Sequence, residues 1–136
     1  MPIEILFSEE LSCWKELVTG DRSPNSPQEK KFVQIIRLFS QLRDIRELLS
    51  LGPKRFEKLS GNLEGLYSSR IDKKDRLIFR VKELTYEEAV KYNPDYKNRF
   101  KNTEETLTVL IFELIDKNHY KRTEKWWKSK QKKVTG

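Results

Sequence analysis

The sequence predicts an α+β fold in which a small, mostly antiparallel sheet carries two N-terminal helices on one face. Two amphipathic stretches come first in the chain, a hairpin pattern follows, and an almost continuously apolar run comes late. A chain of 136 residues with 36% apolar content can bury one core. We therefore expect one domain, residues 1–120, followed by an extension, residues 121–136.

The N-terminal region has the pattern of a strand followed by a helix. Ile3–Phe7 is a short apolar run suited to a strand. Ser8 precedes two glutamates, so its hydroxyl is expected to cap a helix that runs to about Val18. The apolar positions of this helix fall on one stripe and are Leu11, Trp14, Leu17 and Val18.

A second, longer helix is predicted to begin at Ser26-Pro27-Gln28-Glu29. This run combines a capping hydroxyl, a first-turn proline and a reciprocal glutamate. Apolar residues then recur at steps of three and four up to Gly52-Pro53, where we expect the helix to end. They are Phe32, Ile35, Ile36, Phe39, Leu42, Ile45 and Leu49.

A β-hairpin is predicted over residues 66–81. Two apolar runs, 66–71 and 76–81, flank a polar loop of four residues, 72–75. Side chains alternate in the second strand, so one face should be core and the other largely cationic, with Arg76 and Arg80 on it. Arg70 should lie near Arg76 across the pair, and two such charges repel unless an anion sits between them.

The chain beyond the hairpin is interpreted as an insertion, a last strand and a tail. Residues 82–106 are polar and aromatic, with a turn or two of helix expected at 86–90 and a break at Asn93-Pro94. Residues 107–115 (LTVLIFELI) are typical of a strand near the middle of a sheet. His119 follows this strand, and residues 120–133 read as a basic, helical or frayed tail.

All of the net positive charge lies in that tail. Residues 117–136 hold eight of the 28 basic side chains and one of the 21 acidic ones, so the remaining chain is balanced at 20 of each and the total is +7. A basic tail with Trp126 and Trp127 suits nucleic acid, ribosomal RNA included. Equally, the charges fit a solvated helix end, and the two tryptophans could pack on the body of the protein.

Composition excludes some classes of protein. Cys13 is the single cysteine, so neither an internal disulfide nor a cysteine-based metal site is expected, and we expect it to be a small core or boundary residue. No segment has the length and apolarity of a membrane span, and no signal peptide pattern begins the chain. A cytoplasmic protein is the expectation.

Residues suited to RNA cleavage without a metal surround the predicted sheet. They are Glu57 before the hairpin, Arg70 and Arg76 on it, and His119 with Tyr120 after the last strand. Such cleavage needs a base for the 2′-hydroxyl, an acid for the departing 5′-oxygen and a cation for the charge that grows on the phosphate. A carboxylate, an imidazole and a guanidinium would supply these roles.

Residues 57–81 and 107–120 resemble the YoeB/Txe branch of the RelE superfamily of bacterial toxins. The resemblance is carried by the runs EKLSGNL (57–63), GLYS (65–68), RI (70–71), RLIF (76–79) and His119-Tyr120 after an apolar strand. It implies a RelE-like fold and a ribosome-dependent endoribonuclease that cuts mRNA and is silenced by a cognate antitoxin protein.

The resemblance also implies residue roles. Glu57 matches the general base, Arg76 the arginine that supports the transition state, and His119 the general acid. Arg70 and Tyr120 match substrate-binding positions, and we expect Arg80 on the same cationic face to bind substrate as well. No cofactor and no metal are expected, and a homodimer is one possible assembly.

Three departures from the family pattern stand out. The chain continues for 16 residues after Tyr120, the stretch 82–106 is much longer than the family's short turn, and Ser69 replaces a second arginine beside Arg70. The alternative is therefore a non-catalytic RNA-binding or regulatory protein of the same fold, in which the sheet face and the tail hold RNA that is not cut.

Overall fold

A five-stranded mixed sheet organises the computed structural model, which describes residues 3–42, 46–47, 50, 56–117 and 120–135, the last five as backbone only. Its strand order is β1-β5-β4-β3-β2, with β1 parallel to β5 and every other pair antiparallel. The strands are β1 (Ile3–Phe7), β2 (Glu57–Lys58), β3 (Tyr67–Arg70), β4 (Arg76–Thr85) and β5 (Thr106–Asp116). The expected α+β class, with a mostly antiparallel sheet, is confirmed.

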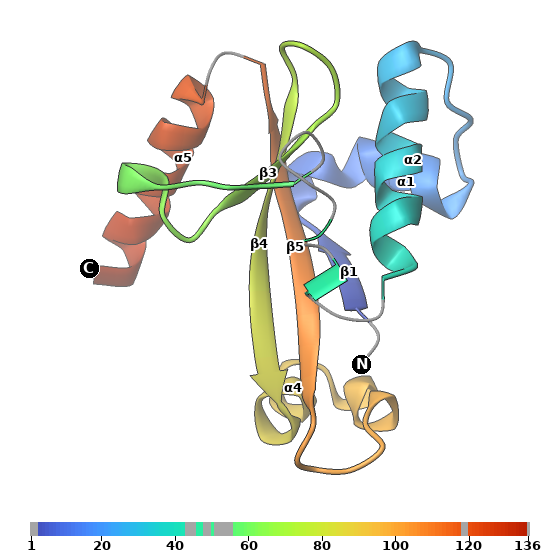
Figure 1. The fold of residues 1–136 in the computed structure, drawn as a ribbon, viewed down its shortest axis with the longest axis vertical. Coiled ribbons are helices and arrows are strands. Elements are labelled where there is room, and N and C mark those ends of the chain that lie inside the picture. Colours follow the sequence, from blue (N-terminus) through green and yellow to red (C-terminus); the bar gives the residue numbers. More distant parts are fainter. Residues whose placement is uncertain (1–2, 43–45, 48–49, 51–55, 118–119, 136) are drawn as a thin grey trace.

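Helices cover both faces of the sheet. One side carries α1 (Ser12–Thr19) and α2 (Pro27–Ser40), the other side carries α5 (Lys121–Thr135), and α4 (Tyr86–Tyr92) lies at the far end of the β4–β5 pair (Figure 1). Short 3-10 helices are η1 (Glu9–Leu11), η2 (Gly61–Leu63) and η3 (Pro94–Arg99). Among the described residues, no helix has the length and apolarity needed to cross a membrane.

The main core lies between the sheet and the two N-terminal helices, as the amphipathic patterns predict. Phe32 and Phe39 of α2 are fully buried against Phe79 of β4 and Phe112 of β5. The ring centroids of Phe79 and Phe112 lie 5.0 Å apart in a tilted arrangement, which aromatic pairs favour. This packing fixes the position of β4 and β5 relative to α2.

The second face of the sheet corrects the expectation of a largely cationic surface. Ile78 and Leu114 are fully buried there, together with Leu66 and the nearly buried Leu59 and Leu63. Tyr120, Trp126 and Trp127 pack against this cluster. The centre of this face is apolar and lies under α5, so the tryptophans pack on the body of the protein.

Residues 82–106 extend the sheet before they leave it. Residues 82–85 continue β4, pairing with the first residues of β5, and the chain then forms α4 and η3. The helix and the break expected at Asn93-Pro94 are confirmed, and a capping box at Thr85 and Glu88 begins α4. Leu84, Ala89 and Tyr96 form a small separate core with the start of β5.

The start of α2 agrees with the sequence pattern, whereas its end does not. Ser26 Oγ accepts a hydrogen bond from Glu29 N at 3.1 Å, and the Glu29 carboxylate binds the amide of Asn25, one residue earlier than a capping box requires. The prediction of one helix up to Gly52-Pro53 is wrong, since α2 ends at Ser40. The amides of residues 41 and 42 bond to carbonyls three residues back, which closes the last turn.

The rest of that prediction depended on residues that lie outside the described part of the chain, namely Ile45, Leu49, Gly52 and Pro53.

Two predictions about the first helix are also wrong. Ser8 does not cap it, because its Oγ donates to the carbonyl of Glu113 at 2.6 Å and so ties the end of β1 to β5. Cys13 is exposed and not part of the core. Its carbonyl accepts a hydrogen bond from Arg22 Nη2 at 2.8 Å.

Candidate functional site

The register of three strands brings Glu57, Arg70 and Arg76 to one face of the sheet. Glu57 pairs with Ser68, and Arg70, two residues further along β3, pairs with Arg76, as predicted. Cross-strand partners share a face, and so do residues two apart on one strand. Neighbouring positions on this face are therefore separated by about 5 Å across strands and about 7 Å along a strand.

The exposure of these residues leaves room for a ligand. Glu57 and Arg70 are exposed, and Arg76 is half-buried. All three lie on the face that α5 covers further along, since Ser68 shares it with Ile78. A carboxylate and two guanidiniums thus line the open end of this face.

The hairpin loop holds the guanidinium of Arg76. Its Nη1 donates hydrogen bonds to the carbonyl oxygens of Asp72 at 2.8 Å, Lys73 at 3.3 Å and Asp75 at 3.2 Å. Its other donors have no acceptor among the described residues. The fork is therefore fixed at one nitrogen, and the remaining donors can reach an anion.

Asp72 makes the loop itself rigid. Its Oδ1 accepts from the amides of Lys74 at 2.8 Å and Asp75 at 2.7 Å, and its Oδ2 accepts from Gln28 Nε2 of α2 at 2.8 Å. The Asp75 amide and then Gln28 hold the pKa of Asp72 below its ordinary value. Burial, followed by the charge of Asp72, raises the pKa of Asp75. The loop thus has a fixed shape on which Arg76 is anchored.

Tyr120 belongs to the same face. Its hydroxyl lies 3.1 Å from Ser68 Oγ, and Ser68 is the strand partner of Glu57. Its backbone adopts a left-handed conformation with φ of 67°, and its amide donates to Asp116 Oδ1 at 3.2 Å. This turn aims the ring at the sheet as the chain enters α5. His119, the predicted general acid, lies outside the described residues, and its role stays a prediction.

Asp116 fixes the start of α5 and was not anticipated from the sequence. It is 1% exposed at the end of β5, and its Oδ2 accepts from both the amide of Thr123 at 2.8 Å and the hydroxyl of Thr123 at 2.5 Å. A carboxylate that binds a first-turn amide stabilises a helix start. The sequence signal that could have identified this contact is an acidic residue at the end of an apolar strand, Asp116, with a threonine seven residues later, Thr123.

Arg80 lies apart from the other two arginines. Ile78 separates it from Arg76 on β4, and its Nη2 lies 3.4 Å from Oε1 of Glu113, a carboxylate in a side chain that is 6% exposed. Both residues line an open depression of about 640 Å³ with Lys82 and Tyr92. Sequence reasoning missed Glu113, although it is the one charged residue within the run LTVLIFELI.

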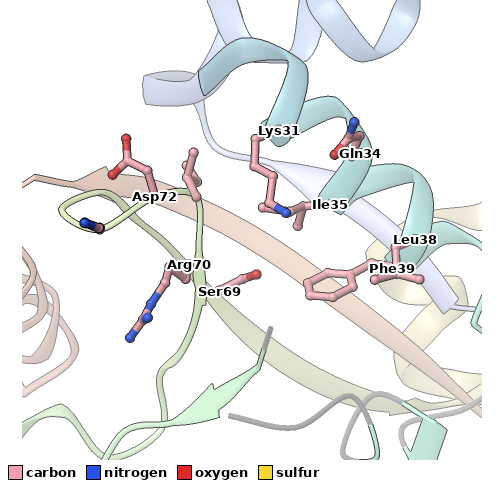
Figure 2. A pocket seen from close by; sticks show the side chains of 10 residues that line it. Lys31, Gln34, Ile35, Leu38, Phe39, Ser69, Arg70 and Asp72 are labelled. Carbon is pink, nitrogen blue, oxygen red and sulfur yellow. The ribbon is translucent and has the colours of Figure 1, made fainter. Parts of the chain in front are cut away.

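A second depression, of about 480 Å³, lies between α2 and the edge of β3. Ser69 points into it toward Phe39, whereas the guanidinium of Arg70 is directed away from the side chains of α2 (Figure 2). The two neighbouring residues therefore serve opposite faces. Elsewhere in the described part of the chain, no group of three or more His, Cys, Asp or Glu side chains could hold a metal ion.

Comparison with known proteins gives structural likenesses only. No family model matches the sequence, and no curated protein matches it. A YoeB/ParE toxin from Agrobacterium tumefaciens is similar over 85% of this chain and 99% of its own, with 14% identity and a TM-score of 0.47.

Two structures from Staphylococcus aureus are also similar. A YoeB-YefM complex matches over 85% of this chain and 97% of its own, with 19% identity and a TM-score of 0.44. A YoeB dimer matches over 80% of this chain and 93% of its own, with 19% identity and a TM-score of 0.35.

Proposed function

We propose that this protein is the toxin of a type II toxin–antitoxin system and cuts mRNA on the ribosome without a metal ion. The observation that carries the proposal is the shared sheet face of Glu57, Arg70 and Arg76. These residues occur in the order and local sequence of the family that residues 57–81 resemble. A cognate antitoxin protein is the proposed partner, and a second copy of the chain is a further one.

The proposed reaction uses the 2′-hydroxyl of the RNA as nucleophile. Glu57 removes its proton, and the oxygen attacks the adjacent phosphorus. Arg76, aided by Arg70, stabilises the negative charge that develops on the phosphate oxygens. His119 protonates the departing 5′-oxygen. The products are a 2′,3′-cyclic phosphate and a 5′-hydroxyl.

The charges around the face fit this role. Arg70 and Arg76 are direct cross-strand partners, and like charges at such positions destabilise a sheet. A phosphate between the guanidiniums would remove that repulsion and accept charge-assisted hydrogen bonds from both. Arg80 is proposed to contact the RNA further along the same face, with its Glu113 partner limiting how strongly it binds.

A second candidate function is a non-catalytic RNA-binding or regulatory protein. It is favoured by the three loop carbonyls that hold Arg76 and by α5, which packs over the sheet face beside the proposed site. In this alternative the arginines and the basic helix hold RNA that is not cut.

Cleavage of ribosome-bound mRNA by purified variants separates the two functions. Glu57→Gln should lower the cleavage rate by a factor of about 100 or more, because a positioned general base contributes on that scale. Glu64→Gln is the matched control, since Glu64 is also exposed and its substitution removes the same charge. Cleavage that is equal in all three proteins would refute the role of Glu57, and RNA binding without cleavage by the wild type would favour the second function.

His119→Ala and Arg76→Ala should each abolish growth arrest when expressed, while far-ultraviolet circular dichroism shows an intact fold. Arrest that persists in both variants would contradict the proposed acid and the proposed cation. Lys58→Ala, which alters an exposed residue of β2, is the control for effects of expression alone.

A further inference from the structure

Three lysines form a stripe on the exposed side of α5. Lys121, Lys125 and Lys128 recur at intervals of four and three residues, so they lie on one side of the helix. All three are exposed. At 1.5 Å of rise per residue the stripe extends about 10 Å along the helix axis, the length of about three nucleotides at 3.4 Å each.

The opposite side of α5 anchors the helix to the sheet. Thr123 is 0% exposed, and Trp126 and Trp127 pack against the apolar cluster of Leu66, Ile78 and their neighbours. The aromatic residues of this helix are therefore turned toward the sheet, and its outer surface carries the lysines together with Glu124. Figure 1 shows α5 beside the turn of η2 on that side of the sheet, away from α1 and α2.

The lysines also line a depression. It has a volume of about 560 Å³ and lies between α5 and η2, where Asn62 and Glu124 complete its lining. Three positive charges face one negative charge there. Arg122, which is not part of the lining, is paired with Glu10, whereas no ion pair involves the three lysines among the described residues.

We propose that this lysine stripe binds the phosphate backbone of single-stranded RNA. Three closely spaced cations that outnumber their one acidic neighbour, Glu124, suit phosphates, and their attraction requires no particular base sequence. A protein partner fits less well, because protein interfaces depend on aromatic and apolar anchors, and those of α5 are partly buried and pack against the sheet. This inference rests on the proposed function, because the stripe is assigned a second contact with the same RNA.

Binding to RNA that cannot be cleaved tests the stripe separately from catalysis. The probe is a 2′-O-methyl oligoribonucleotide, which lacks the nucleophilic hydroxyl, and affinity is measured by fluorescence anisotropy from 50 to 200 mM salt. The variant carries Lys121→Gln, Lys125→Gln and Lys128→Gln. The control carries Lys91→Gln, Lys97→Gln and Lys101→Gln, three exposed lysines at the α4 and η3 end of the molecule.

The stripe variant should show a weaker salt dependence than the wild type. Each single-strand phosphate contact contributes about −0.7 to the slope of log K against log salt, so three contacts change the slope by about 2. Raising the salt fourfold should then weaken the binding of the stripe variant about 20-fold less than that of the wild type. The control should keep the wild-type slope despite its equal change in net charge.

Equal slopes for the wild type and the stripe variant would overturn the proposal. Equal losses in the two variants would overturn it too, since only net charge would then matter. Thermal unfolding confirms that each variant is folded.

A stripe variant that binds RNA normally but no longer binds an acidic protein partner would identify a protein-docking surface instead. A stripe variant that loses RNA binding but cleaves mRNA normally would leave the proposed function intact. A wild type that binds RNA through the stripe but cleaves no mRNA would leave the stripe intact and refute the proposed function.

Discussion

Replacing Asp116 by alanine tests how α5 is held on the sheet. The carboxylate accepts hydrogen bonds from the amide and hydroxyl of Thr123 and from the amide of Tyr120. Both Asp116 and Thr123 are buried. Alanine would leave the two donors of Thr123 without this acceptor in a site that water does not reach.

The expected cost follows from those two donors. A buried donor left without a partner costs about 1 to 3 kcal/mol, so the loss of an acceptor for both donors in Asp116→Ala should lower the free energy of unfolding by about 2 to 6 kcal/mol. Thr123→Val alone keeps the shape of the side chain and should cost about 1 kcal/mol, the net value of one hydrogen bond. In the Asp116→Ala background the same valine should cost nothing or stabilise, because it removes an unpaired hydroxyl.

Urea unfolding of the two single variants and the double variant measures this coupling. Groups that share a hydrogen bond differ from additivity by about 0.5 to 3 kcal/mol. Circular dichroism reports the whole fold, and tryptophan fluorescence reports α5, which carries two of the three tryptophans. An Asp116→Ala variant that loses less than about 0.5 kcal/mol, within the range of neutral surface changes, would refute the account of this helix start.

Three further changes test other parts of the structure. Tyr120→Phe removes the contact with Ser68 and should cost about 1 kcal/mol in urea unfolding, whereas no loss would mean that the hydroxyl is solvated instead. Gly65→Ala should lower the thermal stability by about 1 to 2 kcal/mol, because φ of +98° at Gly65 strains an L-residue, and an unchanged melting temperature would contradict that conformation. Acid should destabilise the protein progressively below about pH 4. Hydrogen bonds from backbone amides lower the pKa of three carboxyls in the folded state. The stability that these carboxylates confer is therefore present above the unfolded pKa and is lost as the pH falls through the folded pKa. The raised pKa of Asp75 opposes this trend. A midpoint of urea unfolding that stays constant between pH 5 and pH 3 would contradict it. The three carboxyls belong to Glu29, Asp72 and Glu88.

Local patterns in the sequence were sufficient for the hairpin, for the presence of two N-terminal helices and for the start of the second one. The four-residue loop and the alternation of β4 predicted the pairing of Arg70 with Arg76, which the register confirms. Ser26 and Pro27 predicted the start of α2 because capping depends on residues close in the chain. The same alternation could not show what covers the second face, since that depends on a helix more than forty residues away.

Tertiary contacts account for the predictions that are wrong. The apolar period of α2 continues past Ser40 in the sequence, yet the chain turns there and still buries Leu42 in the main core. Ser8 bonds to a carbonyl of β5 that no local pattern could identify. Glu113 and Asp116 interrupt or end an apolar strand, and their partners come from other elements.

The chemistry of the RNA ends tests the proposed cleavage most directly. Wild-type protein incubated with ribosomes and a labelled mRNA should leave a 2′,3′-cyclic phosphate and a 5′-hydroxyl, because the 2′-oxygen is the nucleophile. The same mRNA with a 2′-O-methyl group at the cleaved position should remain intact. A 3′-hydroxyl with a 5′-phosphate, or cleavage at the methylated position, would contradict catalysis by Glu57, Arg76 and His119.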